Sequence, residues 1–412
     1  MILKKQRFVI PAALAAGIAG LTACPAGAQT VPTCKSLNLP NPIYGAGGSA
    51  IEPDIGGVAT ALGNLSSNPE SIFFSDAGGA CPQLQSFLSG TETAVYNYWQ
   101  SDGSIHTCTG DGTETIAFAH MGNPVSACPG VTLPASVGDF AAPVQSLNII
   151  TPDASSETSI SAAALYFIYG FGGNPTTDAP PWTTNPAFIV RRTTTSFAQL
   201  LLASAINVPA ASFLGGGGQD SKNGDVVKEI EGDAPTNADE PIGFVSGSTA
   251  DANIGAGKVK TLAYKHYDQT CGYLPDSALG ATDKINVRTG QYYLWTPGHF
   301  FTKVDGTGKI LNQDVANLIG WYEEASTVGG LSVATPPVDV LGLTIKSGDI
   351  PQCAMQATRD GLLGAIRSEA PAAPCTCYFE SKTGGTSCHT CTAGGHECSG
   401  TQVCRNNFCE AY

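Results

Sequence analysis

The chain has 412 residues, a formal net charge of −14 at pH 7, and charged side chains at only 13% of its positions. Such an acidic chain repels nucleic acids, and no basic stripe with interleaved aromatic residues counters that repulsion. The length exceeds what one hydrophobic core usually serves. We therefore expect at least two lobes and no nucleic-acid partner.

The chain begins with the pattern of an export signal. Lys4, Lys5 and Arg7 precede an apolar run over 8–21, which is too short to remain as a membrane anchor. No later segment of the sequence is apolar enough to cross a membrane. We expect an exported protein, located in the periplasm or at the cell surface.

Two cleavage sites follow the apolar run. The sequence LTAC at 21–24 matches a bacterial lipobox, in which Cys24 would carry the lipid. The sequence AGA at 26–28 is a small-residue site of the ordinary secretory kind. The signal peptide would cover 1–23 in a lipoprotein and 1–28 otherwise. We favour the lipoprotein, which would be attached to the membrane only through the lipid on Cys24.

Short strands alternate with helices through the body of the chain. Strands are predicted at 42–48, 71–74, 147–150, 188–190, 242–245, 259–263 and 291–295. Helices are predicted at 82–88, 159–169, from 197 onward, at 315–325 and at 354–367. This alternation predicts an α/β fold with largely parallel sheets.

The C-terminal stretch 369–412 differs from the body in composition. It is poor in aliphatic residues and holds seven of the fourteen cysteines: Cys375, Cys377, Cys388, Cys391, Cys398, Cys404 and Cys409. So few apolar side chains cannot form a core, which predicts a small disulfide-rich module behind an Ala/Pro linker. Cys388, Cys391 and His396 would also suit zinc, but an oxidising compartment favours disulfides. We predict no metal and no other cofactor.

The number of cysteines also predicts an unpaired thiol. Lipidation or cleavage removes Cys24 from the count and leaves an odd number. If Cys353 joins the tail group, that group becomes even. The odd set is then Cys34, Cys81, Cys108, Cys128 and Cys271. The pairing itself stays open.

The segment from Pro186 to Ala205 is the strongest candidate site. The predicted strand at 188–190 leads into Arg191 and Arg192, then hydroxyl residues at 193–196, then apolar residues at helical spacing. A helix start presents unpaired N–H groups and the positive end of the helix dipole, so an adjacent arginine and hydroxyls complete an anion pocket. The alternative is an ordinary capped helix with two solvated arginines.

Several segments follow one another in an informative order. A strand, a glycine turn and a hydroxyl form YGAGGS at 44–49, and 144–152 leads into a helix at 160–170. RTTTS at 192–196, the strand at 242–245 and the segment 286–299 come next. In this order they resemble the phosphate-type substrate-binding proteins of bacterial ABC transporters. The resemblance implies a two-lobed type 2 periplasmic-binding-protein-like fold over 29–368, followed by the module at 369–412.

The resemblance also implies a set of ligand-binding residues. The family holds its oxyanion with helix N-terminal amides, small hydroxyl residues, one arginine and one acidic residue. Carried onto this sequence, Gly48 and Ser49 match the first-lobe residues. Arg192, Thr195 and Ser196 match the loop that contains the arginine. The implied ligand is phosphate or another small oxyanion.

The sequence departs from the family at several of these positions. Phe197 stands where the family has glycine, and Ala198 where it has threonine. Glycine lets the backbone approach a ligand, so a phenylalanine would fill that space or redirect the loop. No acidic residue follows the strand near 115–122, although His120 could supply a donor there. Such a site would favour a fully ionised or differently shaped anion over monoprotonated phosphate.

Catalytic patterns are absent from the sequence. The histidines show no metal-ligand spacing, and no Gly-x-Ser-x-Gly nucleophile elbow occurs, so a hydrolase is the weakest alternative. We predict a non-enzymatic, exported solute-binding protein that delivers phosphate or another small anion to an ABC permease. The alternative is a structural or adhesive cell-surface protein that reuses the scaffold without transport.

Overall fold

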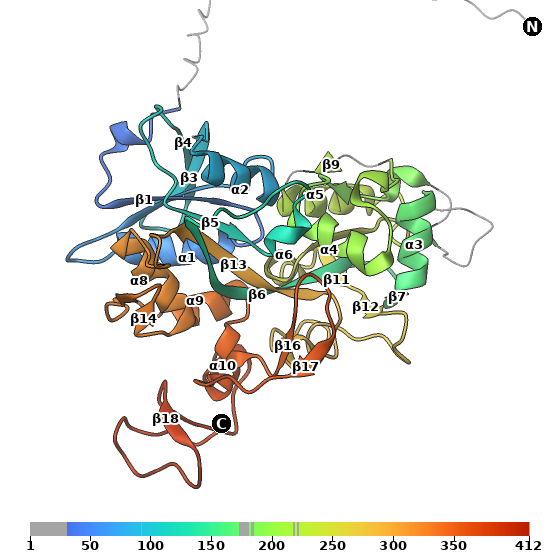
Figure 1. Cartoon of the computed structure of the whole chain (residues 1–412). Helices are drawn as coiled ribbons and strands as arrows, with labels where there is room; N and C mark the ends of the chain where they lie inside the picture. Colours follow the sequence, from blue (N-terminus) through green and yellow to red (C-terminus); the bar gives the residue numbers. More distant parts are fainter. Residues whose placement is uncertain are drawn as a thin grey trace, which may run out of the picture. The chain divides into compact units, whose positions relative to one another are not determined.

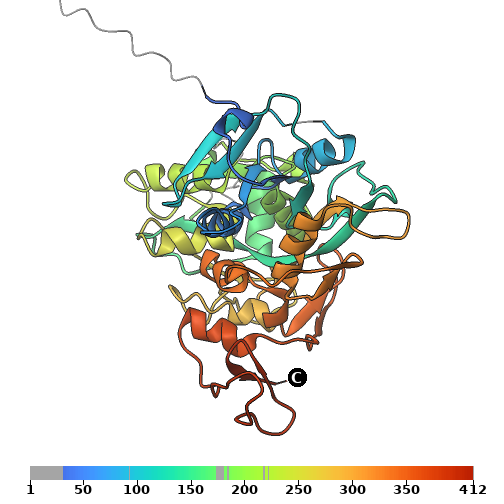
Figure 2. The same ribbon diagram turned by 90° about the vertical axis from the view of Figure 1, so that its left-hand side faces the viewer.

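The computed structural model describes residues 31–91, 93–172, 181–182, 185–216, 219–220 and 222–411. Pro32–Tyr412 pack as one unit (Figure 1 and Figure 2). The predicted signal peptide and Cys24 lie outside the described residues. Within the described part, no helix is both long enough and apolar enough to cross a membrane.

The first half of the body is built on a mixed sheet. Its strands are β1 (Pro42–Gly47), β2 (Ser71–Ser75), β3 (Val95–Trp99), β4 (Ile105–Thr109), β5 (Phe118–Met121), the first part of β6 (Val137–Pro152) and β13 (Trp295–Lys303). Their order is β6-β13-β5-β1-β2-β3-β4. β1 is parallel to β2 and β5, whereas the other neighbouring strands are antiparallel.

Helices cover both faces of this sheet because successive strand residues point to opposite sides. Phe118 packs in one core with α1 (Glu52–Gly63) and α8 (Gln313–Glu323). Its neighbour Ala119 packs on the other face with α2 (Ala80–Ser89). The first half is therefore a three-layer α/β unit.

The second half is organised around the end of β6. β10 (Gly243–Ser246) and β11 (Val259–Thr261) flank it, both antiparallel to it. Ile149 faces the core of α3 (Ala162–Phe171) and α4 (Phe197–Ile206), whereas Ile150 faces α5 (Asn223–Asp233) and α6 (Gly247–Ile254). The short pairs beside this sheet are β7 (Ser159–Ser161) with β12 (Ala263–Lys265) and β8 (Arg191–Arg192) with β9 (Gln219–Asp220).

The long strand β6 joins the two halves. Its 16 residues pair with β13 up to Ser146 and with β10 and β11 from Leu147 onward. The chain passes into the second half through β6 and returns in β13, which runs antiparallel to it in Figure 1. The predicted α/β class and two-lobed arrangement are confirmed.

The last part of the chain lies below the sheets in both views (Figure 1 and Figure 2). Its elements are β14 (Thr327–Val328), β15 (Leu331–Ser332), α9 (Val340–Ser347), β16 (Ala357–Arg359), β17 (Ile366–Ser368), α10 (Thr376–Thr383), β18 (Val403–Arg405) and β19 (Phe408–Glu410). The short α7 (Ile285–Arg288) precedes β13. α9 packs on α1 and on α10, so it connects the first half to the tail.

Disulfides hold the tail, as the composition predicts. The bonds of the tail group are Cys353–Cys375, Cys377–Cys388, Cys391–Cys404 and Cys398–Cys409. The body has Cys34–Cys108 and Cys81–Cys128. Among the described cysteines, Cys271 is the free one, and it is exposed. The even tail group that includes Cys353 is thus confirmed, and Cys388 and Cys391 are not available as zinc ligands.

Four predictions about elements are wrong. The sheets are mixed rather than largely parallel, because hairpins and the return strand β13 run antiparallel. The predicted strand at 188–190 is reduced to a parallel bridge between Ile189 and Ile242, which lies between a 3-10 helix, Pro186–Phe188, and β8. The predicted strand at 291–295 begins only at Trp295, after a turn at Gly290. The predicted helix at 354–367 is the hairpin β16–β17, because Gly361 takes a positive φ of 59° in its turn.

Candidate functional site

Four of the five predicted ligand residues meet at a small cavity between the two halves, and Thr195 does not line it. Its volume is about 10 Å³, which is close to the minimum that a single water molecule needs. The first half contributes Gly48, Ser49, Ala50, Gly79 and Ala80 to its walls. The second half contributes Arg192, Ser196, Phe197, Ala198 and Asn223. We call this space the inner cavity.

Four helices begin at the inner cavity. Ser49 and Ala50 lead into α1, Gly79 caps α2, Ser196 caps α4, and Asn223 is the first residue of α5. The first N–H groups of a helix have no partner within the helix, and the helix dipole makes that end positive. Four such ends around one cavity make its walls attractive to an anion.

Arg192 adds a full positive charge to these walls. Its side chain comes from β8 in the second half, and the residue is 2% exposed. One guanidinium nitrogen donates to Asn223 Oδ1, and Nη2 lies 3.5 Å from Ser49 Oγ in the first half. The Arg192 backbone N–H donates to Gln199 Oε1 at 2.9 Å, which ties β8 to α4. The guanidinium therefore reaches across the boundary between the halves.

Ser196 and Thr195 differ in where their hydroxyls point. Ser196 Oγ accepts the Gln199 backbone N–H at 3.2 Å, so it caps α4 while the residue lines the inner cavity. Thr195 does not line the cavity, and its Oγ1 donates to the carbonyl of Gly78 at 3.4 Å. Thr195 thus contacts the first half outside the cavity wall.

Phe197 reduces the space that the inner cavity offers. Its buried ring lies against Gly122 after β5, where a β-carbon would come within 2.6 Å of a ring carbon. Asn123 Nδ2 donates to the Phe197 carbonyl at 3.2 Å. The phenylalanine therefore packs the start of α4 against the first half, where glycine would leave room.

His120 lies away from the inner cavity. It is buried in β5, with its ring edge-on to Phe300 at 5.3 Å. Burial lowers the pKa of His120 to about 3, so the ring is neutral at physiological pH. In this position His120 does not line the inner cavity, so the structure does not support the hypothesis that it donates to a ligand in the cleft.

Two carboxylates lie near the cavity at positions that sequence reasoning missed. Glu52 begins α1, and Asp76 directly follows β2. Asn97 Nδ2 lies 2.8 Å from Glu52 Oε1 and 3.4 Å from Asp76 Oδ1. Lys222, from the second half, lies 3.0 Å from Asp76 Oδ2. Burial, and then the charge of Asp76, raise the pKa of Glu52 to about 7. In the sequence, the signal for these two acids is weak, because their one distinguishing feature is that each follows a predicted motif by a few residues.

A much larger space adjoins the inner cavity. This outer cleft has a volume of about 840 Å³ and shares Ser49 and Asn223 with the inner cavity. Its walls come from α1 and the β3–β4 hairpin on one side and from α5 and α6 on the other, with α9 at one end. The inner cavity and the outer cleft thus lie next to each other at the boundary between the halves.

Comparison with known proteins finds similar structures among the solved ones. No protein-family model matches the chain, and no curated protein sequence matches it. The chain is similar to a putative phosphate ABC transporter substrate-binding protein with bound phosphate from Clostridium perfringens, at 14% identity and a TM-score of 0.47, over 76% of this chain and 99% of the other. An ABC-type phosphate transport receptor from Vibrio cholerae gives 14% identity and a TM-score of 0.46, over 75% and 99%.

The neighbours also include a protein of another kind. The reduced OxyR regulatory domain from Pseudomonas aeruginosa gives 8% identity and a TM-score of 0.36, over 65% of this chain and 91% of the other. The phosphate-binding neighbours are of the family that the sequence motifs resemble. What this chain binds is argued below from its own residues.

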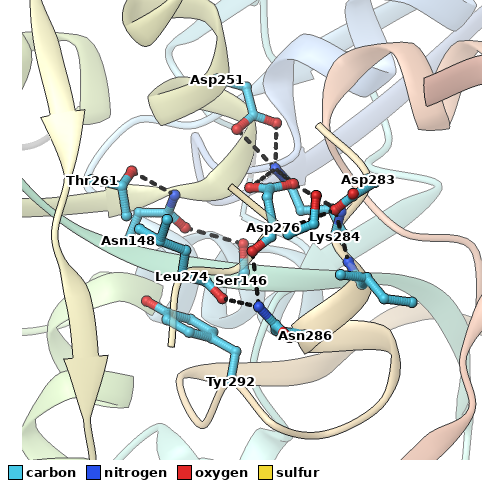
Figure 3. Close-up of polar contacts among 12 residues, drawn as sticks. Ser146, Asn148, Asp251, Thr261, Leu274, Asp276, Asp283, Lys284, Asn286 and Tyr292 are labelled. Atoms are coloured by element: carbon cyan, nitrogen blue, oxygen red, sulfur yellow. Dashed lines mark hydrogen bonds and ion pairs between the residues drawn. The ribbon is translucent and has the colours of Figure 1, made fainter. Parts of the chain in front are cut away.

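A second buried cation lies in the same half as Arg192 (Figure 3). Lys284, just before α7, is 1% exposed. Its Nζ lies 2.7 Å from Asp251 Oδ2 on α6 and 2.9 Å from Asp276 Oδ2. Figure 3 shows the ammonium between the two carboxylates. Because protein groups neutralise this charge, we assign the Lys284 cluster to the fold rather than to a binding site.

Proposed function

We propose that the protein is a solute-binding protein that holds a small oxyanion at the inner cavity, between its two halves. The observation that carries the proposal is the meeting of four helix starts with the Arg192 guanidinium. Backbone N–H groups, hydroxyls and an arginine are the groups that recognise phosphate and sulfate. The ligand residues proposed are Gly48, Ser49, Arg192 and Ser196. Thr195 would hold the two halves together beside the site through its hydrogen bond to the Gly78 carbonyl.

The walls of the inner cavity explain how binding would couple to the fold. Ser49 belongs to the first half and Arg192 to the second, and they are already within 3.5 Å of each other. An anion held by both residues would link the two halves and favour an arrangement closed around it. The volume of about 10 Å³ suits no more than one water molecule, so the halves must lie farther apart than in this structure when the ion is bound.

The chemistry of the walls indicates the charge state of the ion. The described residues that line the inner cavity include no carboxylate to accept a proton from the ligand. A fully ionised oxyanion, such as sulfate or the phosphate dianion, therefore suits the site better than monoprotonated phosphate. In this proposal the protein is exported, carries a lipid on Cys24 and delivers its anion to an ABC permease.

Isothermal titration of the mature protein with phosphate and with sulfate tests the proposal. We expect a dissociation constant below millimolar for at least one of them. Arg192→Gln should weaken binding at least about tenfold, because it removes a buried charge-assisted contact worth roughly 1.5–3 kcal/mol. Arg191→Gln is the matched control, since the Arg191 side chain donates to the Phe213 carbonyl instead.

One observation favours a second candidate function. The inner cavity is nearly filled by the chain itself, partly by Phe197, and the tail is held by disulfides of its own. A cell-surface structural or adhesive protein would use such a scaffold without a ligand. This second function predicts that neither anion binds tighter than millimolar and that Arg192→Gln changes no titration.

A further inference from the structure

The outer cleft is larger than a bare oxyanion needs. Its volume of about 840 Å³ falls within the usual range for small-molecule sites, roughly 300–1,000 Å³. It lies next to the inner cavity: Ser49 and Asn223 line both spaces, and the Arg192 guanidinium contacts both of these residues. A molecule with an anionic head at Arg192 would therefore have its remaining atoms in the outer cleft.

We propose that the ligand is a phosphate monoester of a sugar or polyol, whose phosphate occupies the inner cavity and whose hydroxyl-bearing body occupies the outer cleft. This proposal rests on the proposed function of the inner cavity. It adds a class of ligand that needs both spaces at once.

An aromatic wall on the first half suits the body of such a ligand. Trp99, at the end of β3, is half-buried and lines the outer cleft. Its indole lies directly on α1 at Gly56, where any side chain would overlap the ring. The glycine thus allows the indole to approach α1 closely while Trp99 lines the cleft. The C–H face of a sugar ring packs well on such an aromatic surface.

The polar groups of the outer cleft have mixed character. Glu52 accepts hydrogen bonds, Lys222 and Lys228 donate them, and Thr60 and Asn253 can do both. A ligand with many hydroxyls can satisfy donors and acceptors of either kind, whereas an apolar ligand would leave them without partners. The outer cleft carries charges of both signs, because Lys222 pairs with Asp76 and Lys228 pairs with Asp225, and Lys346 adds a further positive charge at the α9 end.

Titration with matched ligands tests the proposal. Inorganic phosphate, glucose, glycerol 3-phosphate, ribose 5-phosphate and glucose 6-phosphate are titrated into the wild-type protein. We expect at least one of the three esters to bind about tenfold tighter than inorganic phosphate, and glucose to bind weakest. A tenfold gain corresponds to about 1.4 kcal/mol of additional contacts.

Two substitutions locate the body of the ligand. Ala252→Trp adds bulk at an exposed position of the outer cleft on α6, so folding is not at risk. It should weaken ester binding about tenfold and leave inorganic phosphate unchanged, and Trp99→Leu should act in the same direction. Ala211→Trp, at an exposed position that lines neither space, is the control.

The possible outcomes separate this inference from the function on which it rests. If phosphate binds through Arg192 but no ester binds tighter, or if Ala252→Trp weakens both ligands equally, the two-part ligand is wrong and the anion site stands. If neither phosphate nor any ester binds, the anion site itself is wrong and the inference falls with it.

Discussion

Arg192 and Lys284 are both buried cations, yet their surroundings differ. Lys284 lies between the carboxylates of Asp251 and Asp276, within 3.0 Å of each, and its charge is neutralised inside the protein. The Arg192 guanidinium contacts Asn223 and Ser49 and forms part of a cavity wall at the boundary between the halves. The two cations therefore differ in position. Lys284 lies between two buried carboxylates, whereas Arg192 lines the cavity in which the proposed function places an anion.

Lys284→Met gives the largest expected effect. Removing the ammonium leaves Asp251 and Asp276 buried without a cation, which should lower the free energy of unfolding by about 3–5 kcal/mol. Denaturant unfolding at pH 7.5 measures the loss. The loss should be smaller at pH 5, because burial already raises the pKa of Asp251 to about 6 and a protonated acid needs no partner.

The control for Lys284 is an exposed ion pair. Arg367→Met breaks the pair with Asp360, in which both side chains are largely exposed, and should leave the free energy of unfolding unchanged. An equal loss in the two variants would contradict the assignment of Lys284 to the fold.

The second prediction concerns the stabilisation that a bound anion supplies. At a concentration of one hundred times the dissociation constant, phosphate or sulfate should raise the free energy of unfolding by about 2.7 kcal/mol. At the same anion concentration, Arg192→Gln should cut this increase to about 1.4 kcal/mol or less, because its binding is at least about tenfold weaker, whereas Lys284→Met should keep the full increase despite its lower baseline. Thermal unfolding with and without the anion measures both. If the two variants lose the increase to the same extent, the contrast between the cations is not real.

His120 is a third buried titratable group, and it differs from both cations because it stays neutral. No described residue hydrogen-bonds to its ring nitrogens. Its folded-state pKa of about 3 lies below the ordinary value of 6.5. Its contribution to stability is therefore present above pH 6.5 and lost as the pH falls toward 3.

His120→Phe should remove this part of the acid sensitivity. The wild-type protein should lose about 2 kcal/mol between pH 7 and pH 5 through His120 alone. The variant should show a flatter profile of unfolding free energy over the same interval. His106→Phe, at an exposed position, is the control and should follow the wild-type profile. A variant profile as steep as the wild type would show that His120 is not the group responsible.

Local chemistry made part of the site predictable from the sequence. A glycine turn before Ser49 and a hydroxyl cap at Ser196 are short-range signals, and both residues do line the inner cavity. The contact between Lys222 and Asp76 joins segments far apart in the chain, so no spacing rule could reveal it. The same holds for the disulfides, whose number was predictable but whose pairing depends on the folded distances.

The fold was predictable to a similar degree and for the same reason. The strands at Pro42 and Ser71 follow from local apolar runs. The predicted helix at 354–367 failed because apolar residues at helical spacing outweighed Gly361, whose positive φ closes a hairpin. β6 crosses from one half to the other and pairs with β13, which lies almost 150 residues later in the chain. Local sequence patterns could not predict a pairing over that separation.

Glu52→Gln gives the smallest expected effect. It tests whether the charge of Glu52, which lines the outer cleft, changes anion binding at Arg192. The pKa of Glu52 is about 7, so its carboxyl gains a negative charge as the pH rises through neutrality. Glu52 lines the outer cleft together with Ser49, and its charge should repel an anion at the inner cavity by about 1 kcal/mol, or about fivefold in affinity. Sulfate is the proper probe because its own charge is constant between pH 6 and pH 8.5. The wild-type protein should bind sulfate about fivefold more weakly at pH 8.5 than at pH 6. The Glu52→Gln variant should bind equally at both. Asp76 and Lys222 remain paired in that variant, so their charges cannot account for the change.

Glu323→Gln is the matched control, because burial also raises the pKa of Glu323, which lies on α8 and lines neither the inner cavity nor the outer cleft. A pH dependence that persists in Glu52→Gln would place the titrating group elsewhere. It would contradict the prediction that the charge of Glu52 controls anion affinity at Arg192.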